Sequence, residues 1–347
     1  DEENFAGLIT VTAGYIGIPE SAVRRDYYIV LLLKNLQDSE YAGNCVFKGG
    51  TSLSKCYPNS INRFSEDIDL TYVPDTQLSD KQYDKVLKKV EAAIIGDAFS
   101  RKIIEERNDR NKSSYVWFGQ EEMDGGKIKL EIGSSIKPEP YGQKTLTTYI
   151  QQYLKHRRLF DVIEEYALCE VTVNTLKIER TFLDKVFAVK RHACCGTLTG
   201  KVRHIYDVAK LYELDEIQAF LAQKDELKYL VQKTKQTDMF YLNKRGIPDE
   251  YDPSGPYHFA GWRHHFNEEI SKRYESLHEE LLYEKEKQSF TKAIETFERI
   301  DAAFAEIGKY DGIVYRRARQ NGERHGQTRC PRLRLLESHS RQKFHPS

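Results

Sequence analysis

Residues 46–70, VFKGGTSLSKCYPNSINRFSEDIDL, predict a strand, a short helix and a second strand, and these elements decide the fold. A strand candidate over 44–48 runs into a glycine pair, and a helix is expected to begin at Thr51. Glycines at such a turn let backbone N–H groups approach a phosphate closely. Hydroxyl groups at a helix N-terminus also favour an anion. The predicted phosphate contacts in this turn are Lys48, Gly49, Gly50, Thr51 and Ser52.

The second strand, expected over 67–73, has one polar face. Asp67 and Asp69 are two residues apart, so both carboxylates project from the same side of the strand, with their Cα atoms roughly 7 Å apart. Such a pair can hold two divalent cations about 3.5–4 Å from each other, the arrangement that clamps the attacking and leaving oxygens in phosphoryl transfer. We therefore expect Mg²⁺ or Mn²⁺ at these two aspartates.

A third acid is expected from a neighbouring strand. Residues 116–120 and 127–132 are typical of two strands joined by an Asp-Gly-Gly turn at 124–126. In the second strand the isoleucine and leucine side chains share one face, and Glu131 lies on the other. Three carboxylates on one sheet face repel one another strongly unless a cation lies between them. The predicted metal ligands are therefore Asp67, Asp69 and Glu131.

Neither motif is specific on its own. An Asp-x-Asp pair usually marks a solvated strand face, and a Gly-Gly-Thr sequence is usually a turn. In this order, and separated by a loop and a helix between two strands, the combination points much more specifically to chemistry on phosphate groups.

The rest of the chain divides into a mixed part and a helical part. Helices are expected over 20–37 and over 79–95, the second with Ser79 as N-cap. Beyond residue 145 the candidates are helical, including a helix opened by the capping box Thr181-x-x-Asp184. The sequence thus predicts an α+β fold, in which a mixed sheet with helices precedes an all-helical C-terminal lobe. The expected divisions are a first domain over 1–145, a helical domain over 146–315 and a basic, disordered tail over 316–347.

Composition and charge exclude several classes of protein. With 39% hydrophobic and 12% aromatic residues, the chain of 347 residues can build a core. The formal net charge is zero, although residues 316–347 carry nine Lys or Arg against two Asp or Glu. Six cysteines without a CxxC pair indicate reduced thiols rather than a disulfide framework or a zinc site. The longest apolar run, Tyr28–Leu33, is far shorter than the roughly 20 residues of a membrane helix. A cytoplasmic protein without a membrane partner is expected.

These motifs resemble those of the DNA polymerase β-type nucleotidyltransferase superfamily. More narrowly, the chain resembles the AbiEii/AbiGii toxin family of bacterial abortive-infection and type IV toxin–antitoxin systems. The residues that carry the resemblance are Arg25–Tyr28 (RDYY), Phe47–Thr51 (FKGGT), Arg63–Leu70 (RFSEDIDL), Arg180–Lys185 (RTFLDK) and Arg203–Asp207 (RHIYD). The resemblance covers roughly residues 15 to 300 and leaves out the tail. Asp184 departs from the glutamate usual in the family, but the change keeps an acid.

The resemblance implies a bilobed fold, with a nucleotidyltransferase domain over 1–145 and a nucleotide in the cleft. Gly50, Thr51 and Ser52 would contact the triphosphate of an NTP, and the two aspartates would bind Mg²⁺. Lys185 and Asp207, from the helical lobe, would complete the catalytic site. Family members transfer nucleotides to the 3′ end of tRNA, and some are GTP-selective. A cognate antitoxin is also implied, commonly without a stable toxin–antitoxin complex.

Several of these residues also have plain structural readings. Asp184 is accounted for by the capping box, Lys185 can be a solvated surface lysine, and Arg203 and Asp207 can pair along one helix turn. The order of that pair is the weaker one, which slightly favours separate roles.

Arg63 and Ser65, just before the aspartates, also have both a nucleotide-binding and a structural interpretation. Arg63 can hold a phosphate through two parallel hydrogen bonds, or it can pair with Asp26 or Glu66. Ser65 is a further candidate for nucleotide binding, although it can simply shape the turn into the strand.

The function predicted from the sequence is metal-dependent transfer of a nucleoside monophosphate from an NTP to an RNA acceptor, in particular the 3′ end of tRNA. Glu131 or a metal-bound hydroxide would take the proton of the acceptor hydroxyl. Basic clusters over 155–158 and 201–204 are candidate contacts for an RNA backbone. Two alternatives stay open: transfer to a protein or small-molecule hydroxyl, and a non-catalytic nucleotide-binding module.

Overall fold

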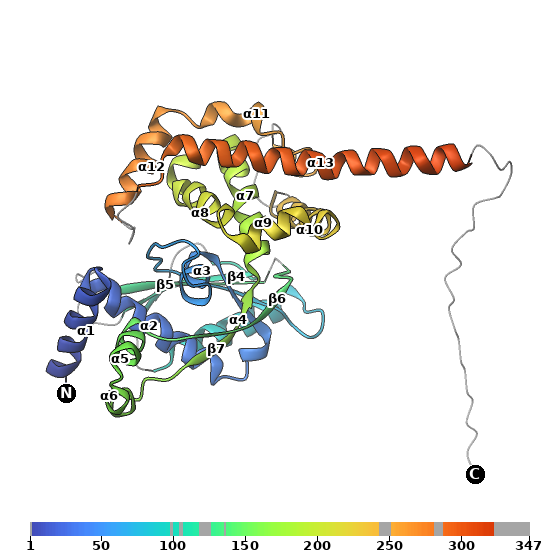
Figure 1. The fold of residues 1–347 in the computed structure, drawn as a ribbon. Helices are drawn as coiled ribbons and strands as arrows, with labels where there is room; N and C mark the ends of the chain where they lie inside the picture. The colour runs from blue at the N-terminus through green and yellow to red at the C-terminus, as the bar shows by residue number, and fades with distance from the viewer. Residues whose placement is uncertain are drawn as a thin grey trace, which may run out of the picture.

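The protein is described in a computed structural model, over residues 2–97, 100–103, 107–117, 126–134, 137–242, 251–280 and 287–322. These residues form a mixed sheet that is followed along the chain by a group of helices (Figure 1). The five cysteines among them, Cys45, Cys56, Cys169, Cys194 and Cys195, are free thiols. None of the helices described is long and apolar enough to cross a membrane.

The sheet region holds these elements: α1 (Glu2–Ile16), α2 (Glu20–Gln37), β1 (Cys45–Lys48), α3 (Gly49–Cys56), β2 (Ile68–Tyr72), α4 (Asp80–Ile95), β3 (Ser100–Ile103), β4 (Asn111–Trp117), β5 (Lys127–Gly133), β6 (Tyr141–Leu146), α5 (Tyr149–Arg157), α6 (Phe160–Glu165) and β7 (Val171–Leu176). The helical region holds α7 (Ile178–Cys194), α8 (Val202–Tyr212), α9 (Asp215–Ala222), α10 (Lys224–Leu242), α11 (Phe259–Trp262), α12 (Glu268–Glu280) and α13 (Phe290–Gly322). Short 3₁₀ turns lie at Ala42–Asn44, Leu198–Lys201 and Arg263–His265.

The described strands form one seven-stranded sheet in the order β3-β4-β5-β2-β1-β7-β6. The central strands β1 and β2 are antiparallel, and each has a parallel neighbour on its outer side, β7 beside β1 and β5 beside β2. The outer pairs are antiparallel hairpin-like ladders. The two motif-bearing strands therefore occupy the middle of the sheet.

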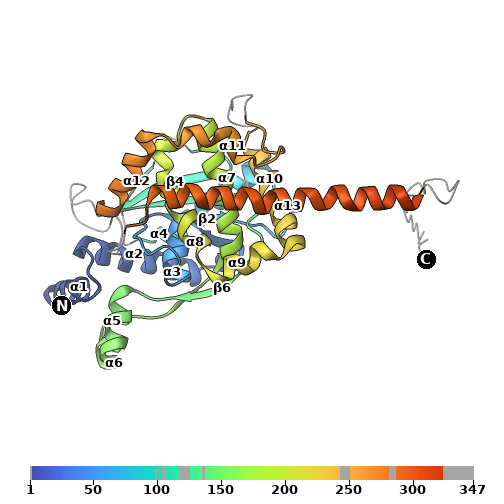
Figure 2. The same cartoon turned by 45° about the horizontal axis from the view of Figure 1, so that its top comes forward.

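The two faces of the sheet have different partners. Helices α2 and α4 pack on one face, and α3 packs against β1, β2, β6 and β7. The helices from α7 onward lie on the same side as α3 (Figure 1). Figure 2 shows α13 running across this helical layer, where it packs against α8 and α10. The sheet face that carries α3 thus looks toward the helical region.

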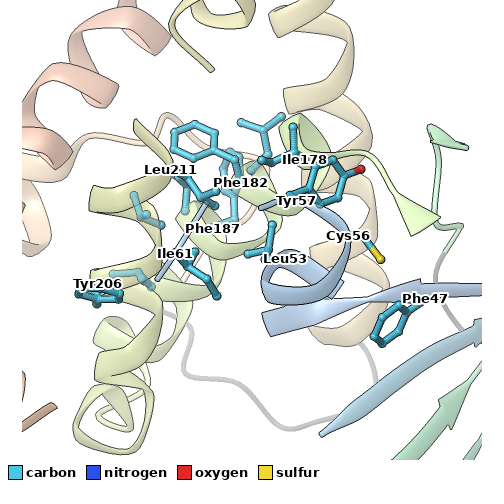
Figure 3. Close-up of a cluster of buried hydrophobic side chains, with 14 of the residues drawn as sticks. Phe47, Leu53, Cys56, Tyr57, Ile61, Ile178, Phe182, Phe187, Tyr206 and Leu211 are labelled. Carbon is cyan, nitrogen blue, oxygen red and sulfur yellow. The ribbon is translucent and has the colours of Figure 1, made fainter. Parts of the chain in front are cut away.

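One hydrophobic core joins the sheet region to the helical region. Leu53, Tyr57 and Ile61, from α3 and the loop after it, lie beside Phe182 of α7 and Leu211 of α8 (Figure 3). These five side chains are all less than a tenth exposed. Burial of large apolar side chains contributes about 1.5–3 kcal/mol each, so this shared core holds the two regions together as one unit.

Much of the expected secondary structure is present. Helix α2 spans the expected 20–37, and α4 begins after Ser79, whose side chain forms a capping box with Gln82. Strands β4 and β5 pair antiparallel, with Trp117 opposite Lys127. The expected turn at 124–126 and the strand end at 118–120 lie largely outside the described residues.

The expectation of a helical chain beyond residue 145 does not hold for β7. Its sequence VTVNTL alternates buried valines with polar residues, and it inserts beside β1 as a parallel strand. Helix α7 begins at Ile178, so the proposed capping box at Thr181 is wrong: the Thr181 hydroxyl donates to the Lys177 carbonyl inside the first turn. At the other end, α13 continues to Gly322, seven residues into the expected tail, and residues 323–347 lie outside the described ones.

Candidate active site

The glycine turn lies at the junction of β1 and α3. Gly49 is the first residue of α3 and has φ +85°, a conformation that residues with a Cβ adopt only with strain. A Cβ on Gly49 would collide with a carboxylate oxygen of Asp69, and a Cβ on Gly50 would lie 2.8 Å from both the Arg63 guanidinium and the Ser65 hydroxyl. The two glycines are needed because functional side chains approach the backbone closely at this turn.

The hydroxyl groups of the turn are used in its construction. Thr51 donates to the Ser65 hydroxyl at 3.0 Å, which ties the start of α3 to the loop before β2. Ser52 is fully buried and donates to the Gly49 carbonyl at 2.9 Å. Both bonds fix the conformation of the glycine turn. The backbone N–H groups in the first turn of a helix have no partner within the helix, which makes such a position favourable for an anion.

Replacing Gly49 with alanine is expected to lower nucleotidyl transfer at least about 100-fold, because the new methyl group displaces the Asp69 carboxylate. Gly17 is the matched control, since it has φ +81° and nothing within 4 Å of its Cβ position. Both substitutions carry backbone strain of about 1–2 kcal/mol. Equal activities of Gly17→Ala and Gly49→Ala, measured beside their melting temperatures, would contradict the close approach described here.

Asp67, Asp69 and Glu131 lie on one face of the sheet and are called the acidic row below. Antiparallel pairing puts Lys48 of β1 opposite Asp69 of β2, and parallel pairing puts Asp69 beside Glu131 of β5. Ser113 of β4 is the next residue across the sheet and donates to Glu131 at 3.3 Å. The carboxyl groups of Asp69 and Glu131 lie side by side, within hydrogen-bonding reach of each other. Because two carboxyl groups can share a hydrogen bond only when a proton lies between them, the pair favours a protonated state.

The charges around this row shift its pKa values in opposite directions. Burial, together with the negative charges of Glu131 and Asp67, raises the pKa of Asp69 to about 6 despite the nearby Lys48. The pKa of Asp67 is raised as well, because neighbouring groups partly desolvate its carboxyl group, although the residue as a whole is exposed. For Glu131 burial acts upward, but the hydrogen bond and charge of Lys129 outweigh it and lower the pKa. Asp69 is therefore the first acid of this row to take up a proton as the pH falls, and its carboxylate is mostly ionised at pH 7.5.

A buried ion cluster connects this row to the helical region. Asp207 of α8 is fully buried and accepts two hydrogen bonds from Arg63, from Nε at 2.6 Å and from a terminal nitrogen at 2.7 Å. Lys185 of α7 pairs with Oδ2 of the same carboxylate at 2.7 Å, the oxygen that also accepts from the Arg63 terminal nitrogen. Burial alone would raise the pKa of Asp207, but the two cations hold it well below its usual range. The carboxylate is therefore ionised at neutral pH.

Arg63 is the bridge between the two regions. Its terminal nitrogen lies close against Gly50, while its Nε is held by Asp207. His204 adds a second contact to Lys185, with 3.4 Å between Nδ1 and Nζ. Burial and the charge of Lys185 lower the pKa of His204 well below its usual range, so the ring is neutral. The structure thus brings Lys185 and Asp207 to the glycine turn through a single arginine.

Several alternative readings are decided by these contacts. Arg63 pairs with Asp207, and the partners considered from the sequence are taken: Asp26 pairs with Lys55, and Glu66 pairs with Arg25. The suggestion that Arg63 pairs with Asp26 or Glu66 is therefore wrong. The sequence did not suggest the true partner, because 144 residues separate Arg63 from Asp207.

The contacts also decide between the alternative interpretations of the residues in the helical region. Asp207 pairs with Arg63 and Lys185, and not with Arg203. Arg203 lies on the exposed side of α8, where its positive charge favours the ionised form of Asp67. Asp184 accepts a bond from Arg180 at 2.9 Å and caps nothing. Lys185 is nearly buried rather than a solvated surface lysine.

Two site residues were not expected from the sequence. Lys129 pairs with Glu131 and belongs to the same strand face, and Ser113 reaches that face from β4. The alternation that places Glu131 opposite the apolar face of β5 also places Lys129 beside it, so the signal was present. His204 and Arg203 lie within the RHIYD segment, but no pattern indicated that they point in different directions.

The donor set of the acidic row suits a hard divalent cation. Asp67, Asp69 and Glu131 offer only carboxylate oxygens, which Mg²⁺ prefers, and positive charge from Lys129 already compensates them in this structure. Within the described ranges, however, no three acidic, histidine or cysteine side chains form a ready-made metal centre. The carboxylates fit a metal in chemistry and have to reorient around it.

Comparison with known proteins identifies a family. The family described as "Nucleotidyl transferase AbiEii toxin, Type IV TA system" matches residues 31–307. Among solved structures, the chain is similar to the nucleotidyltransferase toxin MenT4 of Mycobacterium tuberculosis H37Rv, with 19% identity and a TM-score of 0.43. The similarity covers 86% of this chain and 98% of that chain. No curated protein matches.

Proposed function

The chain belongs to the AbiEii family of nucleotidyltransferase toxins of type IV toxin–antitoxin systems, and we propose that it transfers a nucleoside monophosphate from an NTP to an RNA 3′ end, in particular that of tRNA. The observation that carries the proposal is the contact between the two motifs: Gly49 has no room for a Cβ because the Asp69 carboxylate lies against it. A phosphate at the turn would therefore lie directly beside the acidic row.

In this proposal the triphosphate binds at the N-terminus of α3. The backbone of Gly49, Gly50 and Thr51 supplies N–H donors, and Lys48 and Arg63 supply positive charge. Ser52 and Ser65 hold the turn in shape through the hydrogen bonds described above. Asp207 and Lys185 act through Arg63, whose guanidinium they orient toward Gly50. A planar guanidinium fixed in this way can bind phosphate oxygens with defined geometry.

Asp67, Asp69 and Glu131 would hold Mg²⁺ or Mn²⁺. When bound, such an ion neutralises charge on the phosphate oxygens and orients the reacting groups. The protein's own part is positioning, because phosphoryl transfer needs little covalent chemistry from side chains. The acceptor hydroxyl oxygen bonds to the α-phosphorus, and the bond from that phosphorus to the β-phosphate oxygen breaks. Pyrophosphate leaves, and a carboxylate of the row takes the hydroxyl proton.

An RNA acceptor is supported by the surface above the acidic row. Lys201 and Arg203 are exposed at the start of α8, and the charge of Arg203 acts on Asp67. Phosphate contacts from such cations position a nucleic-acid strand. The other basic cluster, over 155–158, lies at the end of α5, where Lys155 is paired with Glu170. We therefore place the acceptor strand along α8.

Label transfer tests the proposal. Protein is incubated with Mg²⁺, total tRNA and each α-labelled NTP in turn, with Arg203→Ala as the variant in the acceptor surface. We expect label on tRNA from one preferred NTP, and a loss of about tenfold in Arg203→Ala at limiting tRNA. Label that appears instead on protein or on an added aminoglycoside-type hydroxyl would move the function to those acceptors. No label on any acceptor, with NTP binding retained, would favour the nucleotide-binding module.

Acid is expected to weaken metal binding through Asp69. Because the pKa of Asp69 is raised to about 6, protons compete with a divalent cation below that pH. The affinity for Mn²⁺ should change little between pH 8 and 7 and fall about tenfold per pH unit below 6. Titration calorimetry from pH 5 to 8 measures this. A profile with no change above pH 4.5 would contradict the raised pKa.

A further inference from the structure

Lys129 lies beside the three carboxylates that are proposed to hold a divalent cation. It lies on β5, two residues before Glu131, and therefore on the same face of the sheet. Parallel pairing sets Ile68 beside Leu130 and Asp69 beside Glu131. One step earlier in the same register, Lys129 comes beside Asp67. Asp67, directly before β2, and Asp69 of β2 thus lie beside one base and one acid of β5.

The contacts follow this register. The Lys129 ammonium forms an ion pair with Glu131, and it also interacts with the charges of Asp67 and Asp69. Although burial acts in the opposite direction, these acids raise the pKa of Lys129. The Lys129 ammonium therefore offsets part of the negative charge of all three carboxylates, in addition to Lys48 near Asp69 and Arg203 near Asp67.

The ion pair explains why the three acids do not form a ready-made metal centre. Glu131 is turned to Lys129, and it also accepts a hydrogen bond from Ser113 and lies beside Asp69 in the sheet. A divalent cation that takes Glu131 as a ligand has to displace the ammonium. Lys129 and Glu131 are 32% and 36% exposed, so their ion pair is partly solvated and can open without unfolding the strand.

We propose that Lys129 is an intrinsic counter-ion of the acidic row, which keeps the metal-free site folded and competes with the divalent cation for Glu131. The inference rests on the metal site of the proposed function. It assigns Lys129 a positioning role: the residue sets the metal concentration at which the site assembles. After a metal ion displaces it from Glu131, the Lys129 ammonium stays close to the three carboxylates.

The direct test is a titration of Lys129→Met with Mn²⁺ at pH 7.5, in which binding is monitored by electron paramagnetic resonance. Removal of the competing charge is expected to tighten Mn²⁺ binding about 5- to 20-fold. Lys129→Arg keeps a cation at the position and should stay within about twofold of the wild type. Lys127→Met is the matched control, because Lys127 lies two residues away on the same face and stacks over Tyr115 instead.

The metal-free melting temperature gives a second readout. Lys129→Met should melt below the wild type without metal, and this difference should disappear at saturating Mn²⁺. Unchanged or weaker Mn²⁺ binding in Lys129→Met, with normal binding by the wild type, would overturn the inference and leave the proposed function intact. If the wild type binds no Mn²⁺ and Asp69→Asn behaves identically, the proposed metal site fails, and the inference fails with it.

Discussion

Replacing Asp69 with asparagine is expected to lower nucleotidyl transfer by about 10³-fold or more while making the metal-free protein more stable. The loss of activity follows from the position of Asp69, which lies between Lys48 and Glu131 and against Gly49. The gain in stability follows from its surroundings, because they disfavour a charged carboxylate. Active sites often hold groups in unfavourable surroundings of this kind.

The sign of the stability effect can be followed with pH. The folded protein binds a proton at Asp69 more tightly than the unfolded chain, since the pKa rises from 3.8 to about 6. The contribution of this group to stability therefore falls as the pH rises from about 4 to about 6. The melting temperature of Asp69→Asn should exceed that of the wild type at pH 7.5, and the two should converge toward pH 4.5.

A control separates this effect from a general effect of removing an acid. Asp161 is an exposed aspartate in α6, and Asp161→Asn should leave both activity and melting temperature unchanged. Asp69→Asn that melts below the wild type at pH 7.5 would show that its charge is stabilising. That result would contradict the charge cluster described for the acidic row.

Replacing Asp207 with asparagine is expected to lower the free energy of unfolding by about 3–5 kcal/mol. The change leaves Arg63 and Lys185 facing each other in the interior without a negative charge between them. Nucleotidyl transfer should fall as well, because Arg63 loses its anchor beside Gly50. Denaturant unfolding at pH 7.5 measures the first effect. An exposed pair, Lys34 with Asp38, is the control, and Asp38→Asn should cost less than about 1 kcal/mol.

The pH dependence of the Asp207 effect has the opposite sign to that of Asp69. The pKa of Asp207 is lower in the folded protein, so its contribution to stability is fully present above pH 4 and is lost in stronger acid. The difference between wild type and Asp207→Asn should thus be constant from pH 5 to 8. A difference that grows steadily over this range would contradict an ion cluster with a strongly acidic carboxyl group.

Lys185→Met separates stability from catalysis in the same cluster. The variant keeps the two hydrogen bonds from Arg63 to Asp207, so its loss of stability should be smaller than that of Asp207→Asn. An activity that falls as far as in Asp207→Asn would assign Lys185 a role in catalysis beyond its structural one.

The local parts of this site were readable from the sequence. The turn at Gly49, the paired aspartates and the alternation around Glu131 depend on residues that are neighbours along one strand or one helix turn. For the same reason, Ser79 as the N-cap of α4 and the boundaries of α2 were predictable. Short-range geometry fixes such features before the fold is known.

The long-range parts were not readable. Arg63 has acids near it in sequence, yet the fold gives it Asp207, which lies 144 residues away. Strand β7 follows two helices, and only its pairing with β1 and β6 identifies it as an interior strand of the sheet. Lys129 has an ordinary strand pattern, and its role depends on the register between β2 and β5. In each case the deciding partner comes from another element.

The most direct test of the account is a comparison of two labels in one reaction. Wild-type protein and Asp69→Asn are incubated with Mg²⁺, tRNA and the preferred NTP, labelled either at the α- or at the γ-phosphate. Nucleotidyl transfer predicts α-label on the RNA and γ-label in pyrophosphate, in equal amounts, with the wild type only. γ-Label on the RNA, or γ-label released as orthophosphate in step with the reaction, would contradict attack at the α-phosphorus. Transfer by Asp69→Asn at the wild-type rate would contradict the role of the acidic row.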